Sequence, residues 1–221
     1  MRSTTLSLAV LVAAALAVVP MTTQAATFGG EVFGAFNTYS MGDWNDAIDE
    51  SNDLGSEYNN MTNGLTGGLG LRTWANQNWM FSVVWEPLFL NTEDETSDSK
   101  LSFDANSFQL TGAYFFPSTT NQRYGIGAGL GHYSVNGEAE SGGTTVDLEG
   151  STVGFHFMGL GEWRVSPGFA INAAAGYRIA NVDEIEADGT VVENADGPIQ
   201  TDYSGFMSRV GLSFYLPSGS N

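Results

Sequence analysis

The sequence predicts an all-β fold, an eight-stranded antiparallel up-and-down transmembrane β-barrel with long extracellular loops and short periplasmic turns. Three observations predict it. Eight segments alternate apolar residues with small or polar ones at a period of two. Their apolar rows run for about 9–11 residues, the length a tilted strand needs to cross a bilayer. After the first 25 residues no segment approaches the ~18 apolar residues of a membrane-spanning helix.

The predicted strands are joined alternately by long and short connections. The strands are 27–40, 64–75, 79–90, 101–116, 124–135, 151–165, 169–181 and 203–216. The short connections are 76–78, 117–123 and 166–168, and the long ones are 41–63, 91–100, 136–150 and 182–202.

The two faces of each strand differ in a way that favours a membrane barrel. In 151–165, Phe155, Phe157 and Trp163 share one face, while His156 faces the other with glycine and other residues. A soluble sandwich or lipocalin-like barrel remains an alternative, but its exposed face should be rich in Lys, Glu and Thr. Small residues instead suit a narrow, enclosed interior, where His156 is expected to form hydrogen bonds.

The start of the chain predicts export. Residues 1–25 contain Arg2, an apolar stretch and small residues that end at Ala25, which is the pattern of a cleaved signal peptide. Residues 26–221 would then form one barrel domain.

Composition excludes several classes of function. The chain has 7 Lys and Arg against 25 Asp and Glu, which argues against nucleic-acid binding. It has no cysteine, so disulfides, thiol chemistry and cysteine-based zinc sites are excluded. The leading hypothesis includes no metal, no cofactor and no catalytic residue, because no motif of the sequence predicts one with enough support.

Six charged residues occupy the small-residue face, where unpaired charges would be costly. They are Glu31, Arg72, Glu86, Glu162, Arg178 and Arg209. We expect them to form ion pairs that plug the interior, with Arg72, Glu31 and Arg209 close together because their strands are neighbours. A gated polar channel is the alternative, but eight strands enclose little more than side chains.

Most acidic residues lie in the long connections, which contain 21 of the 25. The exposed end should therefore be strongly anionic, and a soluble ligand should be cationic or bridged by divalent ions. Segment 41–63 has Trp44 and Ile48 at helical spacing, with Asp43 as the expected N-cap of a short helix. Gly-Gly and Asp-Gly pairs in 136–150 and 182–202 predict hairpins, so that strands five to eight extend beyond the lipid.

The signal peptide, the eight alternating segments and the amphipathic last strand together resemble the small OmpA/OmpX-like outer-membrane β-barrel superfamily. The resemblance implies a monomer in the outer membrane, in contact with its lipids and lipopolysaccharide. The last strand resembles the family's assembly signal at Arg209, Gly211, Phe214 and Leu216, which implies recognition by the barrel-insertion machinery. The sequence departs from the common form because 217–221 follow.

One pair of residues suggests chemistry. His132 and Ser134 lie two positions apart on one strand face and resemble the His-x-Ser element of outer-membrane lipid A 3-O-deacylases. In that family Asn follows the Ser directly, whereas Val135 does so here, and the expected acid falls at Val146, beside Asp147. The leading hypothesis is a non-enzymatic barrel with a structural or surface-interaction role. A lipid A hydrolase and a narrow solute pore are the alternatives.

Overall fold

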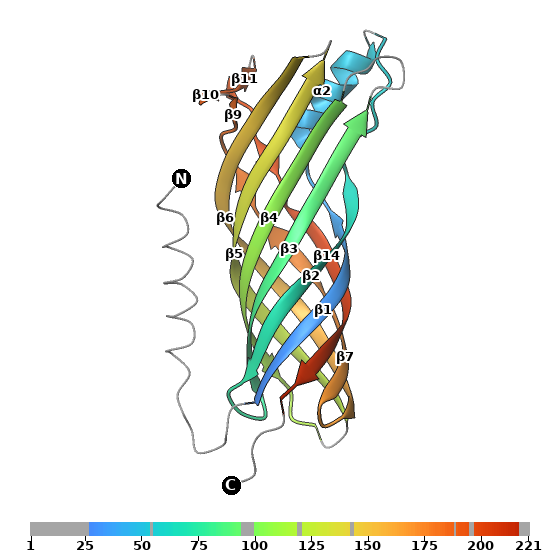
Figure 1. Cartoon of the computed structure of the whole chain (residues 1–221), viewed down its shortest axis with the longest axis vertical. Coiled ribbons are helices and arrows are strands. Elements are labelled where there is room, and N and C mark those ends of the chain that lie inside the picture. Colours follow the sequence, from blue (N-terminus) through green and yellow to red (C-terminus); the bar gives the residue numbers. More distant parts are fainter. Residues whose placement is uncertain are drawn as a thin grey trace.

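The computed structural model describes residues 27–53, 55–93, 100–118, 121–141, 144–187, 189–194 and 197–216. The predicted signal peptide lies outside these residues. Eight strands form the wall: β1 (Thr27–Thr38), β2 (Asn63–Trp74), β3 (Trp79–Glu93), β4 (Lys100–Phe115), β5 (Gln122–Ser141), β6 (Thr144–Ser166), β7 (Phe169–Ile179) and β14 (Gly205–Tyr215). Each pairs antiparallel with its neighbour, and β14 closes on β1 (Figure 1). The predicted eight-stranded up-and-down barrel is confirmed.

Apolar side chains cover the outside of the wall. On β6, Val153, Phe155, Phe157 and Trp163 are each more than half exposed, whereas the inward His156 is buried. The same alternation holds along all of β14. Such a belt suits lipid rather than water. Among the described residues, no helix has the length and apolar character needed to cross a bilayer.

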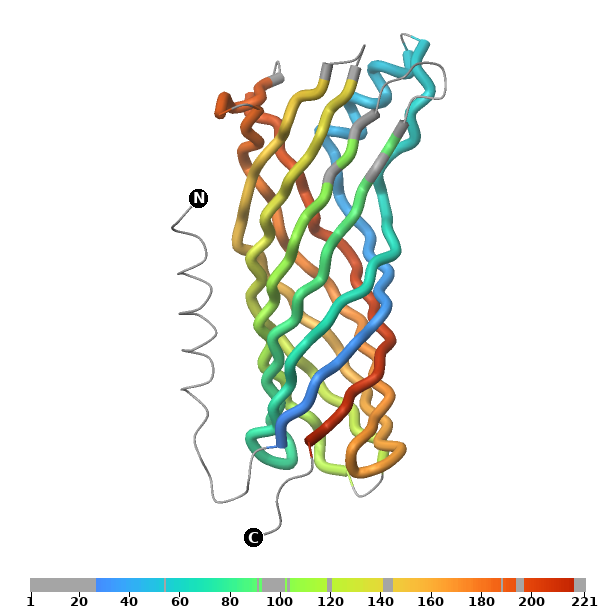
Figure 2. The backbone as a smooth tube through the Cα atoms, viewed as in Figure 1, coloured from blue at the N-terminus to red at the C-terminus, as the bar shows by residue number. Residues whose placement is uncertain are grey.

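The two ends of the barrel differ (Figure 2). The end that carries 75–78, 116–118, Asn121 and 167–168, together with the first and last described residues, is called the turn end. The opposite end, which carries α2 and the segment from β8 to β13, is called the loop end.

Strands continue where two long loops were predicted. β3 reaches Glu93 and β4 starts at Lys100. The described residues of the predicted loop 91–100 therefore belong to the wall. The prediction that 136–150 is a loop is also wrong, because β5 and β6 stay paired up to Ser141 and Thr144. This extension of strands five and six was expected from the Gly-Gly hairpin signal.

The expected extension of strands seven and eight is confirmed in part, because the pairing of β7 with β14 resumes in the same register at 181–182 and 201–202. β7 ends at Ile179 and β14 begins at Gly205, and short strands fill the connection. These are β8 (Asn181–Val182) with β13 (Thr201–Asp202), β9 (Glu186–Ala187) with β10 (Thr190–Val191), and β11 (Glu193–Asn194) with β12 (Gly197–Pro198). β9 also pairs with β6. At the β9–β10 turn, Gly189 has φ +77°, which L residues rarely adopt. The predicted hairpin requires such a positive φ at its turn.

The predicted short helix is present as α2 (Gly42–Asp53) and packs Trp44 and Ile48 into the loop end. Asp43 is not its N-cap. It lies inside the first turn, and its Oδ2 accepts a hydrogen bond from the backbone N–H of Gln200 at 3.0 Å. It therefore joins α2 to the segment before β13.

Candidate functional site in the barrel interior

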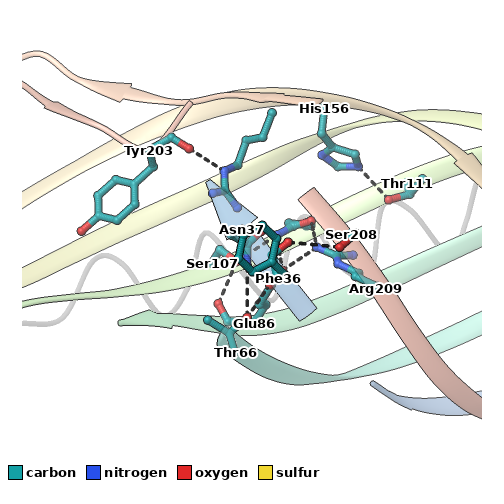
Figure 3. Close-up of polar contacts among 12 residues, drawn as sticks. Phe36, Asn37, Thr66, Glu86, Ser107, Thr111, His156, Tyr203, Ser208 and Arg209 are labelled. Atoms are coloured by element: carbon teal, nitrogen blue, oxygen red, sulfur yellow. Dashed lines mark hydrogen bonds and ion pairs between the residues drawn. The ribbon is translucent and has the colours of Figure 1, made fainter. Parts of the chain in front are cut away.

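Mid-barrel, a buried carboxylate gathers polar side chains from several strands. Glu86 on β3 is 0% exposed. Its Oε1 accepts from Asn37 at 2.9 Å and from Thr66 at 2.8 Å, and its Oε2 accepts from Gln109 at 3.2 Å. Arg209 completes the group with an Nη2–Oε2 distance of 2.5 Å. Figure 3 shows Asn37, Thr66 and Arg209 converging on Glu86.

A second charged group lies nearer the turn end. The Arg72 guanidinium lies between two carboxylates, with Nε 3.4 Å from Glu31 Oε2 and Nη1 3.5 Å from Glu162 Oε2. Glu162 Oε1 lies 3.1 Å from Arg164 Nε, and the Tyr215 hydroxyl donates to Glu162 Oε2. The expected placement of Arg209 beside Arg72 and Glu31 is wrong, because its long side chain reaches across the lumen to Glu86 on β3.

Arg178 departs from the expected pattern of ion pairs. It is fully buried on β7, but no described carboxylate forms an ion pair with it. Its Nε donates to the backbone carbonyl of Tyr203 at 2.8 Å. The structure thus brings five of the six predicted charged residues into two groups and leaves the sixth apart.

Apolar clusters close the interior on both sides of these charges. At the turn end the buried residues are Trp74, Met80, Ala113, Phe115, Ala170 and Tyr215. At the loop end the larger cluster includes Met41, Trp44, Ile48, Leu88, Leu90, Tyr133, Ile185 and Tyr203. Many of its members come from α2 and from the connection between β7 and β14, so the loops themselves fill this end.

Interior glycines make room for the larger inward side chains. A Cβ at Gly129 would clash with the backbone carbonyl of Leu110 and would lie 2.7 Å from two ring atoms of His156. His156 is inward, as expected, and its Nε2 lies 2.8 Å from the Thr111 hydroxyl. Among the described residues, no group of three His, Asp or Glu side chains could hold a metal ion.

The acid expected for the His132–Ser134 pair does not lie beside it. Asp147 is opposite Glu138, six residues along β5 from His132, which is about 20 Å at ~3.3 Å per residue. The His132 Nδ1 lies 3.2 Å from the backbone carbonyl of Thr152. Ser134 lines a polar recess of about 580 Å³ on the outer wall, and His132 is not among the described lining residues. The two side chains therefore do not share one substrate pocket.

The loop end is acidic where it rises above the apolar belt. Glu149, Asp183, Glu184 and Glu186 line the recess beside Ser134. Glu138 lies near the top of β5 and is exposed.

The residues of the expected assembly signal alternate between the two faces of the wall. Arg209 and Gly211 face inward on β14, whereas Phe214 and Leu216, nearer the turn end, are exposed. The last strand is therefore amphipathic, as the sequence predicted.

Known structures share this architecture at low sequence identity. A major outer membrane protein from Thermus thermophilus aligns with TM-score 0.56 and 9% identity, over 87% of this chain and 100% of the other. The chain has the fold of outer-membrane β-barrels. The outer membrane protein OprG from Pseudomonas aeruginosa gives TM-score 0.54 and 9% identity, over 87% and 96%. Neisserial surface protein A gives 0.50 and 14%, over 86% and 99%. No protein-family model and no curated protein matches the sequence.

This fold and the apolar belt agree with the expected location in the outer membrane. The neighbours are surface and outer membrane proteins.

Sequence reasoning missed several residues that complete the interior. Gln109 and Asn37 hold Glu86, and Tyr39, Tyr133 and Tyr203 surround Arg178. Gln109 and Tyr133 occupy inward positions of the alternation, so the period of two could have identified them. Tyr39 and Tyr203 lie in the predicted strands 27–40 and 203–216, on the same face as Glu31 and Arg209, so the period of two could have identified them too, although β1 ends at Thr38 and β14 begins at Gly205.

Proposed function

We propose that this protein is a non-enzymatic outer-membrane barrel whose interior is closed to solutes and whose loop end presents an acidic surface outside the cell. One observation carries the proposal: two interior ion-pair groups lie between an apolar cluster at each end. A continuous aqueous path would have to pass all of these filled levels. Eight strands leave little further room.

The orientation follows from the asymmetry of such barrels, in which short turns face the periplasm and longer loops face outside. The acidic residues of the loop end then contact the headgroup layer and the medium. Divalent ions would bridge them to lipopolysaccharide phosphates, and cationic ligands would bind directly. Cleavage after Ala25 and insertion through the signal at Arg209, Gly211, Phe214 and Leu216 complete the proposed route to the membrane.

Planar-bilayer recording tests the closed interior. The purified protein is inserted into bilayers, and its folding is verified in parallel by the heat-shifted gel mobility of barrels. We expect folded protein without conductance steps. Regular steps from protein that shows the heat shift would overturn the closed interior and support the pore.

A binding assay tests the acidic surface separately. Liposomes that contain the protein are titrated with a Lys-rich peptide at low and high salt, and with a Glu-rich peptide of equal length as control. We expect binding of the Lys-rich peptide alone, weakening as salt rises. A Glu138→Gln/Glu149→Gln variant should bind more weakly, and equal binding by this variant would contradict the assignment.

Mass spectrometry of lipid A separates the hydrolase alternative. Lipid A from cells with the protein, without it and with Ser134→Ala is compared. We expect identical acylation in all three, and loss of an acyl chain that depends on Ser134 would establish the enzyme instead.

A further inference from the structure

The interior charges balance at two levels but not at the third. Nearer the turn end, Glu31 and Glu162 form ion pairs with Arg72 and Arg164. At mid-barrel, Glu86 forms an ion pair with Arg209. Arg178 remains as a cation without a described carboxylate partner. An uncompensated buried charge is costly, so the folded barrel has reason to recruit a negative charge at this position.

The Arg178 side chain has N–H groups that could donate hydrogen bonds to a ligand. It is 0% exposed, and while its Nε donates to the Tyr203 carbonyl, its Nη1 and Nη2 have no hydrogen-bond partner among the described residues. In Figure 3 a dashed line marks the hydrogen bond that the Tyr203 carbonyl accepts. The two NH₂ groups therefore lie inside the barrel without a well-aligned hydrogen bond to a described residue, and the acceptors beside them are the Tyr39 and Tyr133 hydroxyls.

Two tyrosine rings lie beside this guanidinium, and the backbone of a third tyrosine accepts its Nε hydrogen bond. The rings of Tyr39 and Tyr133 lie 5.6 Å from its central carbon, and Tyr203 supplies the carbonyl. The hydroxyls of all three are buried and make no well-aligned hydrogen bond to a described residue, although those of Tyr39 and Tyr133 are close enough to Arg178 to interact with it. Burial raises the pKa of Tyr39 to about 12, although the Arg178 guanidinium beside it opposes the rise, so the hydroxyl keeps its proton.

Apart from the Tyr203 carbonyl, the acceptors beside this guanidinium are neutral tyrosine hydroxyl oxygens, so its positive charge is not neutralised. Guanidinium N–H groups and protonated tyrosine hydroxyls can all donate to one anion. The Tyr133 side chain packs against the backbone of Gly131 and Gly154, where an added Cβ would lie 2.7 to 2.9 Å from its atoms. Apolar members of the loop-end cluster surround the group, which favours a weakly hydrated ion with a single charge.

We propose that Arg178, Tyr39 and Tyr133 bind one small monovalent anion of the chloride type inside the loop end of the barrel. The anion neutralises Arg178 and accepts from the tyrosine hydroxyls. It thereby fixes the loop-end apolar cluster to the charged groups below it.

Bromide identifies the ion directly. The protein is refolded and crystallised in sodium bromide, and anomalous scattering is measured at the bromine edge. We expect a peak within hydrogen-bond distance of Arg178 Nη1 or Nη2 and of at least one tyrosine hydroxyl. Density without an anomalous signal would show water there and overturn the proposal.

A stability measurement tests whether the ion matters in solution. Protein refolded in liposomes is unfolded with urea in sodium chloride or in sodium gluconate of equal ionic strength. Because the anion binds only the folded state, we expect a higher midpoint in chloride, with the folding equilibrium constant rising about tenfold per tenfold chloride at saturation. Equal wild-type midpoints in the two salts would overturn the proposal, even if bromide bound at crystal concentrations.

Variants assign the effect to the site. Arg178→Gln should abolish the chloride dependence, whereas Arg164→Gln, which changes a partly exposed arginine at the turn end, should retain it. If Arg178→Gln does not fold, Tyr133→Phe removes one hydroxyl without a change of charge and should weaken the dependence. A full dependence in Tyr133→Phe and in any folded Arg178→Gln protein would contradict the assignment.

Discussion

Arg72 and Arg178 both face the barrel interior from wall strands, but Arg72 lies between two carboxylates while Arg178 lies among tyrosines and apolar side chains. The difference follows the two halves of the molecule. Toward the turn end and at mid-barrel, carboxylates of the wall form ion pairs with arginines of the wall. At the loop end, α2 and the β7–β14 connection supply much of the packing. Damage to the first half should therefore unfold the barrel, whereas damage to the second should act locally.

The largest effect is expected from Arg209→Ala at mid-barrel. It leaves the fully buried Glu86 carboxylate without its cation and should lower the free energy of unfolding by about 3–5 kcal/mol. Urea unfolding in liposomes measures it. The double variant Arg209→Met/Glu86→Gln removes both charges and should recover part of the loss. An unchanged midpoint in Arg209→Ala would contradict a role for this ion pair in stability.

The outer wall provides a comparison at a similar height. Leu69 on β2 is 56% exposed toward the expected lipid, and Leu69→Arg should cost about 2–4 kcal/mol in a bilayer. Thr66→Ser on the inward face keeps the hydroxyl that donates to Glu86 and should change stability far less. Equal tolerance of both changes would support a soluble barrel. Gly70→Ser is unsuitable as a control, because its Cβ would lie 2.7 Å from Glu31.

A smaller and local effect is expected at α2. Trp44 is buried, and its Nε1 donates to the Thr201 hydroxyl at 2.9 Å. Trp44→Ala should lower the local opening free energy of α2 by about 2 kcal/mol while the urea midpoint of the barrel stays unchanged. Amide hydrogen exchange over 42–53 measures the first quantity. Trp44→Phe keeps the apolar contact and should lose less protection, and a large fall in the global midpoint would show that the two halves fold as one unit.

The smallest effect is expected from deletion of 186–192. The segment contacts the wall mainly through the pairing of β9 with Leu148 and Glu149 of β6, above the apolar belt. Insertion and the heat shift should therefore be retained. A Gly/Ser replacement of equal length serves as control. Loss of the folded barrel in the deletion alone would show that this segment contributes to the wall.

The sequence alone was sufficient to predict the strands of the barrel wall. A period of two assigned strands, faces and membrane character because each residue's side is fixed by its own position on the strand. Glu86, Arg178 and Arg209 were placed inward for that reason. The hairpin signal at 141–143 and the helical spacing of Trp44 and Ile48 were likewise local and were correct.

Only the tertiary structure decided which inward groups meet. Arg209 and Glu86 lie on β14 and β3, which are not neighbours in the wall, and their contact across the lumen depends on strand tilt and stagger. The same geometry placed Arg178 among Tyr39, Tyr133 and Tyr203 rather than beside a carboxylate. Tilt and stagger arise when the whole sheet closes, and no local pattern of residues encodes the resulting height of each side chain.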